Sequence, residues 1–204
     1  MKKKEKIQDY YESKMGQGLP DYGVLGWESE KAQYLRFDML TDNIPLEGRS
    51  LLDIGCGMGN LLEYIEGKNI NVKYTGVDIL DSMIEHARCK ELKGDFQCAD
   101  VFEGSPFPGN SFDVVYTSGI FNLNLGNNSD FLENALEKML KLAREAVVFN
   151  LLHKDSPGRE DKYFYYDPEE VKELLKKFAE IDRVAIIQKY LNNDFTVICY
   201  KRKE

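Results

Sequence analysis

Residues 51–60 read LLDIGCGMGN, an apolar run that ends in three glycines at alternate positions, Gly55, Gly57 and Gly59. The apolar run predicts a buried strand, and the residues from Asn60 onward have the spacing of a helix. Glycines between a strand and a helix let the backbone turn tightly and let a ligand approach the main chain. The nucleotide pattern GxGxxG would place its third glycine where this chain has Asn60, so the spacing disfavours a nicotinamide dinucleotide.

Downstream of residue 50, short apolar runs alternate with helical patterns. Strands are predicted at 50–55, 72–78, 96–100, 112–118, 146–152, 183–190 and 195–201, and helices at 60–66, 82–88, 130–143 and 168–178. This alternation favours βαβ units and a parallel sheet. Residues 191–194 have the length of a hairpin loop, so the final strand is expected to run antiparallel. The predicted fold class is α/β, an open seven-stranded sheet that is mostly parallel with an antiparallel last strand and helices on both faces.

The expected organisation is a single domain over residues 1–204. The composition, with 43% hydrophobic and 30% charged residues, is typical of a globular protein, and the chain contains no internal repeat or Pro/Ser-rich linker. Residues 4–15 and 28–43 have helical spacing and precede the sheet. We expect residues 1–44 to form a helical cap or lid over an α/β core at 45–204.

Charge and cysteine usage limit the partners. The net charge is −8, from 27 Lys plus Arg against 35 Asp plus Glu. This acidic balance disfavours DNA, because nucleic-acid-binding proteins usually carry a basic footprint. No apolar run approaches the roughly 20 residues that cross a bilayer, so no membrane partner is expected. The four cysteines are scattered without a CxxC pair, which indicates reduced thiols in the cytoplasm and no metal site.

An aspartate lies at or near the end of each of the first three predicted strands: Asp53, Asp78 and Asp100. The carboxylate of Asp53, just before the glycines, would attract a sulfonium or ammonium group and repel a pyrophosphate. Asp78 is placed to accept two hydrogen bonds from a ribose diol, and Asp100 to accept one from an adenine amine. Neighbouring parallel strands end at one crevice, so the three should lie together. For Asp53 alone, the alternative is a carboxylate that only caps local backbone groups. For Asp78 it is a solvated cap, and for Asp100 a common strand ending.

With these motifs the chain resembles the class I S-adenosylmethionine-dependent methyltransferases, a family with a Rossmann-like fold. The family pattern (D/E)xGxGxG corresponds to residues 53–59, the ribose acid to Asp78, and the adenine-edge acid with its apolar neighbour to Asp100 and Val101. The resemblance covers roughly residues 45–204 and implies S-adenosylmethionine as the cofactor. It also implies that Gly55 and Gly57 lie against the methionyl group, with Gly59 completing the loop, that Ile79 packs on the adenine and that Ser118 borders the cofactor.

The resemblance implies direct in-line transfer of a methyl group to a small-molecule acceptor. Because the donor is already activated by its charge, the protein acts mainly by holding the two reactants in a near-attack geometry. A base is needed only where the acceptor must lose a proton, and His153, after the strand at 146–152, is the catalytic candidate. Its alternative is a solvated loop residue. Residues 117–124, TSGIFNLN, lack the Asn/Asp-Pro-Pro-aromatic motif of related nucleobase methyltransferases, which again disfavours DNA.

Aromatic and polar residues near the cap and the strand ends are candidates for the acceptor site or the lid. In the cap these are Tyr22, Trp27 and Arg36, and beyond the fourth strand they are Phe121, Asn122 and Tyr165. Packing in the core or under the lid is the alternative for the aromatic members.

Two other functions stay open at this point. A non-catalytic S-adenosylmethionine-binding sensor or subunit would keep the cofactor loop and lack an acceptor site, and turnover would separate it from an enzyme. A nucleotide-dependent oxidoreductase would bind NADH, which the glycine spacing opposes. No motif indicates the acceptor, the acceptor atom or the oligomeric state.

Overall fold

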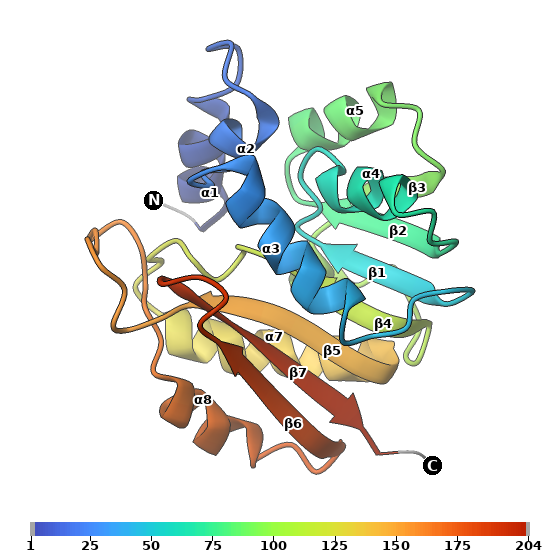
Figure 1. The fold of residues 1–204 in the computed structure, drawn as a ribbon, viewed down its shortest axis with the longest axis vertical. Coiled ribbons are helices and arrows are strands. Elements are labelled where there is room, and N and C mark those ends of the chain that lie inside the picture. The colour runs from blue at the N-terminus through green and yellow to red at the C-terminus, as the bar shows by residue number, and fades with distance from the viewer. Residues whose placement is uncertain (1–2, 203–204) are drawn as a thin grey trace.

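The computed structural model describes residues 3–202. Over this range a seven-stranded sheet forms the centre, in the order β3-β2-β1-β4-β5-β7-β6 (Figure 1). The strands are β1 (Ser50–Ile54), β2 (Lys73–Asp78), β3 (Gly94–Cys98), β4 (Phe112–Thr117), β5 (Ala143–Leu152), β6 (Ile181–Gln188) and β7 (Asp194–Lys201). Strands β1 to β5 pair in parallel, and β7 lies antiparallel between β5 and β6. The predicted sheet, mostly parallel with an antiparallel last strand, is confirmed.

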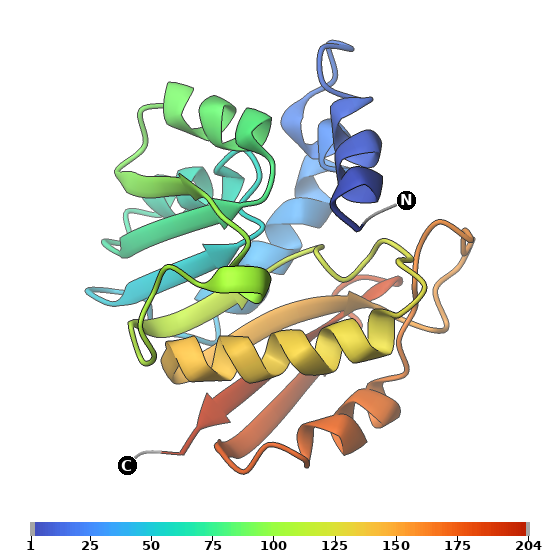
Figure 2. The ribbon, with the colours of Figure 1, turned by 180° about the vertical axis from the view of Figure 1, so that it is seen from behind.

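Helices cover both faces of the sheet, as the sequence predicted (Figures 1 and 2). One face carries α3 (Glu30–Thr41), α4 (Asn60–Gly67) and α5 (Asp81–Cys89), and the other carries α6 (Val101–Gly104), α7 (Asn128–Leu142) and α8 (Pro168–Leu175). The N-terminal helices α1 (Lys3–Glu12) and α2 (Asp21–Val24) lie beside the carboxyl ends of the strands. The N-terminal helical cap is therefore present.

Two apolar clusters, one on each face, hold these layers together. Successive strand residues point to opposite faces, so Leu52 and Ile54 of β1 pack with α7 while Leu51 packs with α3 and α4. Val147 and Val148 of β5 divide between the clusters in the same way. Strands covered on both faces read as continuous apolar runs, which is why the sequence predicted them clearly.

Two short helices, α2 and α6, were not predicted. Each has four residues, too few to show an apolar period. The remaining differences are at the ends of elements. The helix expected at 168–178 ends at Leu175, the strand expected at 96–100 is Gly94–Cys98, and the strand expected at 146–152 begins at Ala143.

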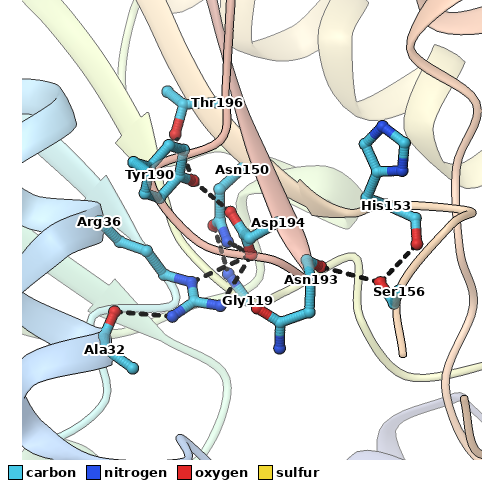
Figure 3. A network of polar contacts seen from close by, with 10 residues as sticks. All are labelled: Ala32, Arg36, Gly119, Asn150, His153, Ser156, Tyr190, Asn193, Asp194 and Thr196. Carbon is cyan, nitrogen blue, oxygen red and sulfur yellow. Dashed lines mark hydrogen bonds and ion pairs between the residues drawn. The ribbon is translucent and has the colours of Figure 1, made fainter. Parts of the chain in front are cut away.

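A buried ion pair joins α3 to the sheet (Figure 3). The Arg36 guanidinium lies 2.9 Å from the Asp194 carboxylate, and both side chains are almost completely buried. Asp194 Oδ2 also accepts a hydrogen bond from Asn150 Nδ2 at 2.8 Å, and Asn150 Oδ1 accepts one from the Gly119 N–H at 3.1 Å. The Tyr190 hydroxyl donates to the other oxygen of Asp194. Helix α3 is thereby fixed to β5, to β7 and to the loop after β4.

Breaking this pair is expected to destabilise the fold. Asp194→Ala leaves a buried guanidinium without its counter-charge, so the free energy of unfolding in urea should fall by about 3–5 kcal/mol. The double variant Arg36→Met/Asp194→Leu removes both charges and should lose less than Asp194→Ala alone. Glu173→Ala, which removes an exposed ion pair on α8, is the control and should change stability by less than about 1 kcal/mol. Similar losses for Asp194→Ala and Glu173→Ala would contradict this account of α3.

Candidate functional site

The turn from β1 into α4 is built on left-handed backbone. Gly55, Gly57 and Gly59 have φ values of 75°, 53° and 79°, a region that residues with a Cβ rarely adopt. A Cβ at Gly59 would also lie 3.1 Å from the Phe96 ring. The Gly55 N–H donates to the Val77 carbonyl at 2.8 Å, which ties the turn to β2. The turn itself therefore requires these glycines.

Asp78 ends β2 and faces the glycine loop. Its carboxylate accepts hydrogen bonds from the Gly57 N–H and the Leu80 N–H, both at 3.0 Å. Burial raises the pKa of Asp78, and these backbone hydrogen bonds oppose the rise. Each carboxylate oxygen has a further lone-pair position. The side chain therefore fixes the loop and keeps acceptor capacity for hydroxyl groups of a ligand.

Asp53 is nearly enclosed, with 4% of its surface exposed. The Tyr74 hydroxyl donates to its Oδ2 at 2.6 Å. Burial raises the pKa of Asp53 to about 7, the Tyr74 hydrogen bond opposes the rise, and the charge of Asp78 adds to it. A cation bound beside this carboxyl group would favour its ionised form.

Asp100 follows β3 and caps α6. Its Oδ1 accepts a hydrogen bond from the Phe102 N–H at 2.9 Å. Asp100 also lines a cavity at the strand ends, together with Ile79 and Val101. Capping uses one oxygen and leaves the other for a ligand, so the two roles are compatible.

A first cavity of about 120 Å³ lies at the carboxyl ends of β1 to β4. Of the residues that the sequence predicted to contact the cofactor, Gly59 alone does not line it. Those that do are Asp53, Gly55, Gly57, Asp78, Ile79, Asp100, Val101 and Ser118. The three aspartates thus share one crevice with the glycine loop, as the parallel topology predicts.

Side chains from the cap and from the loop after β4 press against the glycine loop. A Cβ at Gly57 would lie 2.9 Å from Leu25 Cδ2, and a Cβ at Gly55 would lie 2.3 Å from Ile120 Cγ2. Tyr11 of α1 lines the same cavity. The enclosed volume is smaller than the roughly 300–1,000 Å³ of typical ligand sites. We therefore expect a ligand of nucleoside size to displace part of this lining.

A second cavity, of about 480 Å³, adjoins the first. Its lining comes from α1, α3 and the segments at 25–28, 119–123, 152–165 and 191–193, and it is rich in tyrosine and asparagine. Five residues line both cavities: Tyr11, Leu25, Trp27, Gly119 and Leu123. We call these five residues the shared wall, because ligands in the two cavities would meet there.

The structure brings some of the predicted acceptor residues to the second cavity and leaves others outside it. Those that line it are Trp27, Arg36, Asn122 and Tyr165. Arg36 is already engaged in the buried ion pair. Phe121 is fully buried in the cluster around α7, which corresponds to the packing alternative, and Tyr22 lines neither cavity.

His153 also lines neither cavity. Its Nδ1 accepts a hydrogen bond from the Asp155 N–H at 3.0 Å, and its Nε2 lies 3.2 Å from Gln188 Oε1. Both nitrogens are occupied by local partners, so the structure gives this histidine no contact with either cavity.

Several lining residues were missed from the sequence. Gln33, Leu25 and Ile120 line the first cavity, and Tyr10 and Tyr163 line the second. Gln33 is only 3% exposed although it is polar. Its position one turn before the buried Phe37 on α3 was the available signal.

The comparisons with known proteins agree with this geometry. The family described as a methyltransferase domain matches residues 51–147. A protein of Mycobacterium tuberculosis that is named as a methyltransferase is 28% identical over 161 residues, which cover 74% of this chain and 93% of that protein. Together with the fold, these matches support a class I S-adenosylmethionine-dependent methyltransferase. Its cofactor is S-adenosylmethionine.

Two more distant matches differ in what they methylate. One is the crystal structure of magnesium protoporphyrin IX methyltransferase from Synechocystis with bound SAH. It matches with a TM-score of 0.65 at 15% identity, and the match covers 97% of this chain and 93% of that one. This likeness shows the shared fold. The bovine (Bos taurus) 18S rRNA (guanine-N(7))-methyltransferase is 30% identical over 101 residues. That match covers 43% of this chain and about a third (35%) of the length of the bovine protein.

Within residues 3–202, none of the helices has both the length and the apolar character needed to span a membrane. The same part of the chain shows no cluster of three or more His, Cys, Asp or Glu side chains suited to a metal ion.

Cofactor affinity of the methyltransferase should depend on pH through Asp53. Its pKa of about 7 means that the carboxyl group is largely protonated at pH 6, whereas a bound sulfonium favours the charged form. We expect the calorimetric affinity for S-adenosylmethionine to fall by up to roughly tenfold per pH unit below pH 7. Asp53→Asn should remove this dependence, and 5′-methylthioadenosine, which has no cationic sulfur, should not show it. A wild-type affinity that is flat from pH 5.5 to 8 would contradict the placement of the cation beside Asp53.

The stability of the ligand-free protein gives a second readout of the same group. The folded state keeps the Asp53 proton up to about pH 7, whereas the unfolded chain loses it near 3.8. The Asp53 contribution to the free energy of unfolding should therefore decrease as pH rises between these values and then become constant. Asp53→Asn should remove this component in urea denaturation. If the difference in the free energy of unfolding between wild type and Asp53→Asn stays constant from pH 4 to pH 7, the raised pKa of Asp53 is contradicted.

Trp27 should report closure of the cap. Its ring stacks with the Arg36 guanidinium at 4.3 Å and lies against Gly119, where a Cβ would be 3.0 Å away. We expect Trp27 fluorescence to change on addition of S-adenosylmethionine, and Trp27→Ala to slow transfer more than it lowers stability. The alternative is a fixed contact between cap and sheet. Unchanged emission together with a loss of about 3–5 kcal/mol for Trp27→Ala would decide for that alternative.

Proposed function

We propose that this methyltransferase transfers a methyl group to a small molecule bound in the second cavity. The observation that carries the proposal is the shared wall, because a cofactor in the first cavity and an acceptor in the second would meet at these five residues. In this proposal residues 1–204 act as one unit, with the cap at 1–44 closing over the core at 45–204. The four free thiols favour the cytoplasm as its location.

The lining of the first cavity matches the chemistry of S-adenosylmethionine. Asp78 accepts hydrogen bonds from the ribose hydroxyls, and Asp100 accepts one from the adenine amine. The carboxylate of Asp53 stabilises positive charge on the methionyl part. Ile79 and Val101 would pack on the adenine, Gly55 and Gly57 would lie against the methionyl part, and Ser118 would border it.

When bound, S-adenosylmethionine supplies a methyl group on a cationic sulfur that leaves as a neutral thioether. The chain contributes position, and holding two reactants in line lowers barriers by up to about 7–11 kcal/mol in intramolecular models. Leu25 and Leu123 exclude water from the shared wall, and burial raises the pKa of Tyr11 so that its hydroxyl stays neutral. The shared wall contains no carboxylate or imidazole. A proton lost by the acceptor would therefore have to pass to a group outside the shared wall, and Glu28 and Glu160 are the carboxylates that line the second cavity.

Size and charge favour a small molecule over RNA. The second cavity falls within the roughly 300–1,000 Å³ typical of small-molecule sites. Arg36 is the single cation among the described residues that line it, and Asp194 already balances that charge. A net charge of −8 also opposes the phosphate contacts that RNA requires.

The direct test is incubation with S-adenosylmethionine and a metabolite library, with S-adenosylhomocysteine quantified by mass spectrometry. The proposal predicts turnover with at least one small molecule. Methylation of RNA without turnover of any small molecule would contradict it. Binding of the cofactor without turnover of any acceptor would instead favour a non-catalytic sensor or subunit.

A substitution at Asn122 should distinguish acceptor binding from cofactor binding. It is 9% exposed and lines only the second cavity, and its Oδ1 has no hydrogen-bond partner among the described residues. Asn122→Leu removes the polar groups at similar volume, so kcat/KM for the acceptor should fall roughly tenfold or more while Kd for S-adenosylmethionine stays within about twofold. Asn134→Leu on the exposed side of α7 is the control. A matching loss of cofactor affinity in Asn122→Leu would contradict the division between the cavities.

A further inference from the structure

Asn122 carries an unpartnered side chain close to the boundary between the two cavities. It is 9% exposed, it lines the second cavity, and its buried Oδ1 has no hydrogen-bond partner among the described residues. Its Nδ2 lies 3.9 Å from the position of a Cβ at Gly119, a member of the shared wall. An amide oxygen only accepts hydrogen bonds, and a buried acceptor without a donor is costly. A ligand at this point is therefore expected to bring a hydrogen-bond donor.

The charged groups that line the second cavity favour a ligand with positive charge. Glu28 and Glu160 line it from two separate segments of the chain, and Arg36, the one described cation in the lining, is balanced by Asp194. Glu28 has no ion-pair partner among the described residues. Glu160 pairs with Lys162 at 2.8 Å in an exposed position, where ion pairs are weak. An anionic ligand would face these carboxylates without a free cation in the lining.

Other cations near the second cavity lie outside its lining. Lys14 lies over the Tyr10 ring at 3.8 Å from its centroid, and the Arg159 guanidinium lies 5.6 Å from the centroid of Tyr165. Arg159 also donates to the Lys154 carbonyl at 3.0 Å. These contacts place the two cations against tyrosine rings and backbone. The lining itself therefore keeps its negative character.

The composition of the shared wall separates amines from other hydrogen-bond donors. An alcohol or phenol becomes an effective nucleophile as it loses its proton, so its reacting oxygen needs a base beside it. The shared wall has neither a carboxylate nor an imidazole, and the amide oxygen of Asn122 is not a base near neutral pH. A neutral amine attacks through its own lone pair and keeps its N–H bonds during transfer. An amine therefore fits the site without a base at the reacting atom.

We infer that the methyl acceptor is a primary or secondary amine, attracted as an ammonium ion by Glu28 and Glu160 and oriented by a hydrogen bond from its reacting nitrogen to Asn122 Oδ1. The inference rests on the proposed function and names the class of acceptor for the second cavity. Asn122 is in this account a residue that determines specificity for the acceptor. The two carboxylates act on its capture.

The transfer then balances as follows. The ammonium ion first gives one proton to a carboxylate of the lining or to water, because a simple amine is mostly protonated at neutral pH. The nitrogen lone pair forms a bond to the methyl carbon while the carbon–sulfur bond breaks, and the electron pair of that bond stays on sulfur as a neutral thioether. The positive charge passes to the methylated nitrogen.

The first test divides a metabolite library by reacting group into amines, alcohols and phenols, thiols, and carboxylic acids. Each class is incubated with wild type and S-adenosylmethionine, and mass spectrometry identifies the methylated atom. We expect turnover of at least one amine, with kcat/KM roughly tenfold or more above that of the alcohol and carboxylate of matched carbon skeleton. Methylation predominantly at oxygen, sulfur or carbon would overturn the inference. Cofactor binding without turnover in any class would instead contradict the proposed function.

The second test uses the amine that turns over and its trimethylammonium analogue, which keeps the charge and has no N–H. Glu28→Gln/Glu160→Gln should raise both KM for the amine and Ki for the analogue roughly tenfold, because it removes the attraction for a cation. Asn122→Leu should lower kcat/KM for the amine roughly tenfold and leave Ki for the analogue within about twofold of wild type. Glu137→Gln, on the exposed side of α7, is the matched control for charge and should change neither value.

Two results of the second test would overturn the inference. One is an unchanged KM and Ki in Glu28→Gln/Glu160→Gln, which would show that the acceptor is not captured as a cation. The other is an equal loss for the amine and its analogue in Asn122→Leu, which would show that this residue shapes the cavity and does not accept an N–H. The calorimetric Kd for S-adenosylmethionine should stay within about twofold of wild type in every variant, so that a change confined to the acceptor is distinguished from misfolding.

Discussion

The hydrogen bond from the Gly57 N–H to the Asp78 carboxylate joins the β1–α4 turn to the end of β2, and the site is organised around it. A turn with three left-handed glycines loses much conformational freedom on folding, so it needs partners that hold it in place. Asp78 and the Val77 carbonyl are those partners. They are in reach because β1 and β2 are adjacent and parallel and end at the same edge. The interaction that orders the turn thereby fixes the position of a carboxylate at the centre of the cavity.

The cap consists of a fixed part and a part that is held more weakly. Helix α3 is anchored by the buried pair of Arg36 with Asp194. Helix α1 reaches the segment after β5 through the hydroxyl groups of Tyr10 and Tyr163, 2.7 Å apart, and α2 reaches α5 through an ion pair of Asp21 with Lys90. Both contacts are partly exposed, and such polar contacts contribute little to stability. The main attachment of α1 and α2 is a small apolar cluster in which Val24, Met58, Leu80 and Met83 are buried. We expect the opening that admits the cofactor to fall on α1 and α2, while α3 keeps its place against the sheet.

The strands and the three strand-end aspartates could be predicted because their signals are local. Alternation of apolar runs with helical patterns identifies parallel strands, and parallel strands bring Asp53, Asp78 and Asp100 to one edge. The pair of Arg36 with Asp194 could not be predicted, since it joins residues 158 positions apart. For that reason the sequence suggested Arg36 as a lid residue, although its charge is balanced by Asp194 inside the fold.

Side-chain direction was the second property that could not be predicted from the sequence. His153 follows β5 as predicted, but its ring turns to Gln188 and the Asp155 N–H rather than to a cavity. Phe121 and Asn122 are neighbours in the chain, yet Phe121 belongs to the core and Asn122 lines the second cavity. The second cavity itself depends on contacts among α1, α3 and the segment at 152–165, none of which leaves a pattern in the sequence.

The most direct test of the central claim is a crystal structure of the methyltransferase with S-adenosylhomocysteine. The account predicts the adenine at Asp100, the ribose hydroxyls on Asp78, and the sulfur facing the shared wall of Tyr11, Leu25, Trp27, Gly119 and Leu123. A ligand that lies in the second cavity, or one whose sulfur faces away from the shared wall, would contradict it.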